Sequence, residues 1–71
     1  MENHQLAQRV RAFRKLKGYT QQELAAELQI SVAVLGSLER GTRRPEQKLL
    51  ERIADKLNID YNELTDSEHS S

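Results

Sequence analysis

The chain has 71 residues, no cysteine, and 11 basic against 11 acidic side chains, so its formal net charge is zero. A chain of this length forms one small domain, and the absence of cysteine excludes disulfides and thiolate-bound metals. The sequence has no apolar run near the roughly 18 residues of a membrane span and no signal peptide, so we expect a cytoplasmic protein.

The zero net charge conceals an uneven distribution. Residues 1–45 carry eight lysines and arginines against four acidic residues, whereas residues 46–71 carry three against seven. The N-terminal part is therefore basic and the C-terminal part acidic. A basic part favours a polyanionic partner such as nucleic acid, which the total charge alone would argue against.

A first helix is predicted from Asn3 or His4 to Lys17, because apolar residues recur at helical spacing and Gly18 follows as a stop signal. These apolar residues are Leu6, Val10 and Phe13. The basic residues towards the end of this helix suit the helix dipole whatever the function.

Two short helices follow, each with its own start signal. Thr20 can cap the first, and Glu23 three residues later completes a capping box. Ser31 can cap the second helix with its hydroxyl in the same way. The two predicted helices therefore begin close together in the chain.

The first of these helices is predicted over residues 21–28 and the second over residues 32–40, before Gly41. Helices this short are marginal in water on their own, so they must pack on flanking helices. A pair of helices joined by a tight turn is the form of the helix-turn-helix motif, whose second helix enters the major groove of DNA.

The next predicted helix spans residues 46–57, where Pro45 restricts its entry and Asn58 can take the left-handed conformation at its end. Its core stripe is predicted to consist of Leu50, Ile53, Ala54 and Leu57.

A last short helix begins at Asp60, which forms a variant of the capping box with Glu63. The residues from Thr65 to Ser71 are polar and acidic and are expected to be disordered. We therefore expect a single domain over residues 1–65, with the helix-turn-helix at 21–40, and a disordered tail over residues 66–71.

One set of residues allows a comparison with a known family. It comprises Arg14, Gly18, Thr20, Gln21, Glu23, Leu24, Ala25, Ile30, Ser31, Leu35, Leu38, Glu39, Arg40, Gly41, Arg44 and Pro45, followed by Leu50, Ile53, Ala54, Leu57 and Ile59. Through these residues the segment 9–59 resembles the phage repressor and Cro (XRE-like) helix-turn-helix family. The resemblance implies an all-α, compact five-helix bundle of the lambda-repressor-like type, which binds double-stranded DNA as a homodimer.

The resemblance also implies roles for residues outside the second short helix. Arg14 is expected to pair with Glu39 in a partly buried ion pair. Thr20 and Gln21 are expected to anchor the first short helix on a phosphate, since free amides and the positive dipole end suit an anion there. Gln29 departs from the family, which commonly has glycine at this left-handed turn position.

In this motif, the second short helix determines which DNA bases are contacted. Opposite Leu35 and Leu38, its outward face has no Arg, Lys, Asn or Gln in the first two turns, so direct contact with base edges is expected to be thin. The residues predicted to face the groove are Ser31, Val32, Ala33, Gly36 and Ser37. The residues predicted to hold the DNA backbone are Arg40, Arg43 and Arg44.

Two functions remain open. The favoured one is a sequence-specific transcriptional regulator, more specifically a repressor, that depends largely on DNA shape and phosphate contacts. The alternative is a helix-turn-helix module that binds a protein, as an antirepressor, antitoxin or assembly partner, because an apolar outward patch can mark a protein interface.

An enzyme is not expected, because His4 and His69 lie near the ends and no phosphate loop, metal-ligand cluster or nucleophile elbow is present. We expect no cofactor, no metal, no membrane and no small-molecule effector in this domain. The dimer interface is expected at Leu49, Ile59, Tyr61 and Leu64, although these residues could instead close the core.

Overall fold

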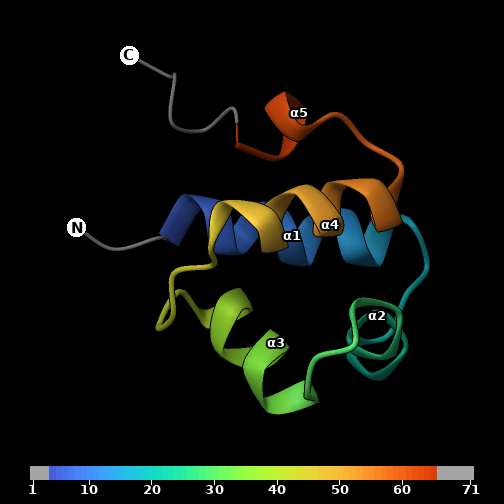
Figure 1. Cartoon of the computed structure of the whole chain (residues 1–71), viewed down its shortest axis with the longest axis vertical. Helices are drawn as coiled ribbons and strands as arrows, with labels where there is room; N and C mark the ends of the chain where they lie inside the picture. The colour runs from blue at the N-terminus through green and yellow to red at the C-terminus, as the bar shows by residue number, and fades with distance from the viewer. Residues whose placement is uncertain (1–3, 66–71) are drawn as a thin grey trace.

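The computed structural model describes residues 4–65, and within them the chain forms five α-helices and no β-strand (Figure 1). The helices are α1 (His4–Leu16), α2 (Gln21–Leu28), α3 (Val32–Arg40), α4 (Gln47–Leu57) and α5 (Tyr61–Thr65). The all-α, five-helix prediction is confirmed, and each predicted helix is present. The proposed tail over residues 66–71 lies outside the described residues.

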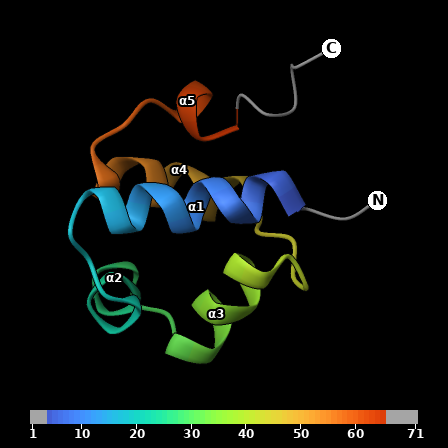
Figure 2. The ribbon, with the colours of Figure 1, turned by 180° about the vertical axis from the view of Figure 1, so that it is seen from behind.

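Helices α1 and α4 run side by side in the same direction and form the middle of the bundle (Figures 1 and 2). Helix α5 packs on one side of this pair, whereas α2 and α3 lie on the opposite side. The acidic last helix is thus separated from α3 by the middle of the bundle.

Every helix contributes to one apolar core. Its largest fully buried side chains are Val10, Leu24, Leu28, Leu35, Leu38, Ile53, Leu57 and Leu64. The predicted stripe of α4 is buried throughout, and Leu35 and Leu38 of α3 face the core as predicted. Phe13, predicted as a core residue of the first helix, is only partly buried against this cluster. Because the core holds one face of α3, the other face is left available at the surface.

The predicted start signals of α2 and α3 both form. Thr20 accepts a hydrogen bond from the Glu23 amide at its Oγ1 (3.0 Å), and its own amide donates to Glu23 Oε1 (2.9 Å). Ser31 Oγ accepts from the Val34 amide at 3.0 Å. These bonds satisfy amides that have no partner within a helix, and so they define where each helix begins.

The turn between α2 and α3 depends on a left-handed residue. Gln29 has φ of 60° and ψ of 40°, and the amide of Ile30 donates to the Ala25 carbonyl at 3.0 Å. The prediction that the chain enters the left-handed region at Gln29 is confirmed. Asn58 takes the same conformation after α4, with φ of 59°.

The structure differs from the predictions at four boundaries, one of which is the start of α5 at Tyr61 in place of Asp60. The first helix ends at Leu16, one residue early, and α4 begins at Gln47 because Glu46 is its N-cap. Thr65 is buried at the end of α5, where its hydroxyl donates to the Tyr61 carbonyl at 3.0 Å, so its assignment to the tail was wrong. A threonine hydroxyl that bonds the preceding turn can be buried despite its polarity.

None of the helices in residues 4–65 has the length and apolar character needed to cross a membrane.

Candidate nucleic-acid interface

The first turn of α3 is open to solvent on the side away from the core. Ser31 and Ala33 are exposed, and 40% of the Val32 surface is accessible, whereas Leu35 beneath them is fully buried. Ser37, one turn further along, is partly exposed. The predicted groove-facing side of α3 is therefore largely at the surface, and its exposed end is small and apolar.

Gly36 lies on the same outward side but is buried, because the side chain of Arg40 covers it. A Cβ atom placed on Gly36 would lie 3.1 Å from Nη1 of Arg40, and Nη2 of Arg40 is 3.4 Å from Ser37 Oγ. Gly36, which was predicted to face the groove, is thus itself covered in this structure. Arginine side chains on a helix extend over the preceding turn, which brings residue 40 above residue 36.

The far end of α3 is held by a buried ion pair with α1. Arg14 Nε donates to Glu39 Oε2 at 2.6 Å and Arg14 Nη2 to Glu39 Oε1 at 3.1 Å, so the contact is bidentate. Arg14 Nη1 also donates to the Tyr19 carbonyl at 2.8 Å. Both residues are buried, so the arrangement implied by the family resemblance is present in the structure.

Gln21 joins this ion pair from the first turn of α2. Its side-chain amide donates from Nε2 to Glu39 Oε1 at 3.0 Å. The residue predicted to anchor α2 on a phosphate is thus tied to the end of α3, a link that the sequence did not indicate. Because Glu39 bonds both Arg14 and Gln21, one carboxylate sets the relative position of α1, α2 and α3.

The beginning of α2 remains able to receive an anion. Thr20 is exposed, and its hydroxyl caps the amide of Glu23. The amides of Gln21 and Gln22 belong to the first turn, where a helix has no internal acceptors and its dipole is positive. Thr20 therefore serves as the N-cap of α2, and an anion would be bound by the backbone amides of the first turn that follows it.

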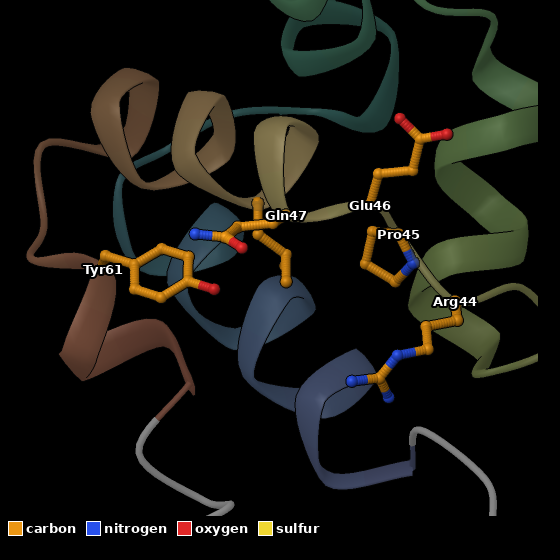
Figure 3. Close-up of a pocket in the computed structure, with 6 residues that line it drawn as sticks. Arg44, Pro45, Glu46, Gln47 and Tyr61 are labelled. Atoms are coloured by element: carbon orange, nitrogen blue, oxygen red, sulfur yellow. The ribbon is translucent and has the colours of Figure 1, made fainter.

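The two loop arginines after α3 lie in different surroundings. Both are exposed, but Arg44 lines an open pocket with residues of α4 and α5, where the Tyr61 side chain also lies (Figure 3). The remaining lining residues are Pro45, Glu46, Gln47 and Leu50. Arg43 does not line this pocket.

Sequence analysis missed one residue that supports the motif. Arg52 of α4 donates from Nη2 to the Leu28 carbonyl at 2.6 Å, and so it caps the last turn of α2. Nearby, Lys56 lies 3.6 Å from Glu27. The available signal was the recurrence of Lys48, Arg52 and Lys56 every four residues in an otherwise acidic segment, which places the three on one side of a helix.

No group of His, Cys, Asp or Glu within residues 4–65 is arranged to hold a metal ion. The exposed side chains around α3 are hydroxyls, small apolar groups and arginines. The arginines suit the charged backbone of a polyanion, and the small apolar and hydroxyl groups suit its less polar parts.

Comparison with known proteins agrees with this interpretation. The helix-turn-helix family HTH_3 matches residues 10–64 of the chain. The uncharacterized HTH-type transcriptional regulator YazB of Bacillus subtilis strain 168 is 50% identical over 68 residues, which are 96% of this chain and 99% of YazB.

Two solved structures show the same fold. The restriction-modification controller protein C.AhdI from Aeromonas hydrophila superposes with a TM-score of 0.82 at 31% identity, over 86% of this chain and 92% of that chain. The biofilm regulator SinR, solved in complex with DNA, superposes with a TM-score of 0.79 at 31% identity, over 84% of this chain and 97% of that chain. The chain spans 60% of full-length SinR of Bacillus subtilis.

The family match covers most of the chain, and the fold and the paired helices agree with it. The chain therefore belongs to the helix-turn-helix family of the XRE type, to which the phage repressors and Cro proteins belong.

Proposed function

We propose that this protein is a transcriptional regulator, and more specifically a repressor, that binds double-stranded DNA by placing α3 in the major groove. The observation that carries the proposal is the outward face of α3, which is accessible at Val32 and Ala33 while the buried Arg14–Glu39 pair fixes the other end. A rigid, exposed helix of this kind is what the helix-turn-helix motif presents to DNA.

The roles of the site residues follow from their positions. Ser31, Val32, Ala33 and Ser37 lie where groove contacts would form, and Val32 and Ala33 suit the methyl groups of thymine. The first-turn amides of α2, which begin at Thr20 and Gln21, would bind one phosphate. Arg40, Arg43 and Arg44 supply positive charge near the end of α3.

Binding as a homodimer is part of the proposal. Of the four residues expected at a dimer interface, Leu64 is fully buried and closes the core, whereas Leu49, Ile59 and Tyr61 are only partly buried. Leu49 lies on α4, Ile59 in the turn that follows it and Tyr61 on α5, and α5 packs on the side of the α1–α4 pair opposite α2 and α3. A partner there would leave both copies of α3 free to contact one DNA duplex.

A protein-binding role is the second candidate, and it is favoured by the exposed Val32 at the tip of α3. The two candidates differ in their dependence on salt. DNA binding releases counterions, so its affinity should fall steeply as salt rises from about 50 to about 200 mM. An apolar protein interface should be much less sensitive.

The direct experiment is selection of bound sites from a random pool of double-stranded DNA with the purified chain, followed by affinity measurements at several salt concentrations. Enrichment of one sequence, with an affinity that falls steeply with salt, supports the proposal. Failure to retain any DNA at about 50 mM salt would exclude it. Enriched sites with two inverted halves about one helical turn apart would support the homodimer.

A further inference from the structure

The guanidinium group of Arg40 lies on the outward face of α3, beside the helical turn that precedes Arg40. Its Nη1 lies over Gly36 and its Nη2 is 3.4 Å from Ser37 Oγ. A long basic side chain thus reaches the part of α3 that, by sequence alone, holds only small groups. Arg40 itself stays exposed, so the group lies at the surface and not within the core.

Any side chain at position 36 would crowd this arrangement. The nearest atoms to a Cβ placed on Gly36 are Nη1 and Cζ of Arg40, at 3.1 Å and 4.0 Å. A Cβ atom there would therefore press on the end of the Arg40 side chain, and no other residue outside the backbone of α3 lies within 4 Å of it. Glycine within a helix is less favourable than alanine, so its presence here is not explained by the stability of α3.

The position gives Arg40 a capability that the other outward residues lack. Val32 and Ala33 have no polar side-chain atom, and Ser37 has one hydroxyl. An arginine side chain presents several N–H donors in one plane, and two of them match the O6 and N7 acceptors of guanine in the major groove. Within residues 4–65 Arg40 forms no ion pair, since the neighbouring Glu39 is engaged by Arg14 and Gln21.

We propose that Arg40 is the specificity-determining side chain of α3 and that it recognises a guanine through the base edge. The proposal rests on the proposed DNA-binding function, and it changes the role of Arg40 from a backbone contact to a contact with a base. Gly36 is the positioning residue, because without a Cβ it lets the guanidinium lie over the preceding turn of α3, where it would enter the groove together with Val32 and Ala33.

The test compares sites selected from a random double-stranded DNA pool by the unchanged protein, by Arg40→Ala and by Arg43→Ala. The unchanged protein should select sites with a guanine at one fixed position in each half. Arg40→Ala should reduce the preference for that guanine over other bases by about tenfold or more. Arg43→Ala, the matched control, should keep the preference and bind all sequences more weakly.

A second variant tests whether the position of the Arg40 guanidinium matters in addition to its charge. Gly36→Leu keeps the Arg40 side chain but occupies the space in which its guanidinium lies. It should lose the guanine preference to the same extent as Arg40→Ala, while circular dichroism shows an unchanged helical content. A merely structural role for Arg40 would leave the base preference of Arg40→Ala unchanged.

The possible failures are distinguishable. If Arg40→Ala weakens binding to every sequence by one common factor, Arg40 is a phosphate contact and this inference is wrong, while the regulator proposal stands. The inference is also wrong if the selected site has no fixed guanine. If the unchanged protein enriches no sequence at all, the proposed function itself fails, and the role of Arg40 fails with it.

Discussion

Arg14 and Glu39 meet in a two-point ion pair that joins α1 to the last turn of α3, with side chains that are 8% and 1% exposed. Removing one partner would leave the other charge buried without compensation. We expect Arg14→Met to lower the free energy of unfolding by roughly 3–5 kcal/mol. Urea denaturation followed by circular dichroism measures this loss, which approaches the whole stability of a small domain.

The matched control is Arg11→Met, which changes an exposed arginine of the same helix. It should alter the free energy of unfolding by less than about 0.5 kcal/mol. A loss below about 1 kcal/mol for Arg14→Met would show that water compensates the charge of Glu39 and that the pair is not essential to the position of α3.

Gln29 is a side chain in a left-handed conformation, with φ of 60°. Glycine takes this conformation without steric cost, so Gln29→Gly should raise the free energy of unfolding by about 1 kcal/mol and increase the melting temperature. Ala26→Gly, an exposed residue within α2, should lower it by a similar amount because glycine is unfavourable inside a helix. If Gln29→Gly lowered the free energy of unfolding as Ala26→Gly does, the strain assigned to Gln29 would be contradicted.

Arg52 binds the Leu28 carbonyl at 2.6 Å and so satisfies the end of α2. Arg52→Met should lower the free energy of unfolding by about 1–2 kcal/mol, since a hydrogen bond from a charged group to a helix end is lost. Lys56→Met removes only the exposed pair with Glu27 and should cost less than about 0.5 kcal/mol. Thermal denaturation of both variants compares them; a larger loss for Lys56→Met would reverse their assigned roles.

Arg43 is exposed in the loop after α3, where a phosphate contact is proposed. Its replacement by alanine should reduce the slope of log affinity against log salt by about 0.9, the contribution of one neutralised phosphate on duplex DNA. Fluorescence anisotropy with a labelled duplex at several salt concentrations measures the slope. An unchanged slope would place Arg43 away from the DNA backbone.

Much of the fold was predictable because the helix starts are encoded locally. Thr20 and Ser31 both act as caps, and Gln29 and Asn58 both take the left-handed conformation at helix ends. Apolar spacing then identified the buried faces of α3 and α4, and boundaries differ by at most one residue in the first four helices. The predicted family and fold class are confirmed.

The site was less predictable, because its key contacts join side chains that are distant in sequence or end on the backbone. The hydrogen bond from Gln21 to Glu39 leaves no pattern in the sequence, and the spacing of Arg52 with Lys48 and Lys56 indicates a helix face but not the contact with the Leu28 carbonyl. The position of the Arg40 guanidinium depends on the absence of a side chain one turn earlier. The pairing of Arg14 with Glu39 was expected only through the family resemblance.

A Cβ atom at position 36 would meet the tip of one flexible arginine side chain and no atom of the apolar interior within 4 Å. Because Arg40 is proposed to read a base, we expect a small substitution there to change which operators the protein prefers without opening the apolar core. A single codon thus offers a route by which duplicated copies of such a gene could acquire separate sets of targets.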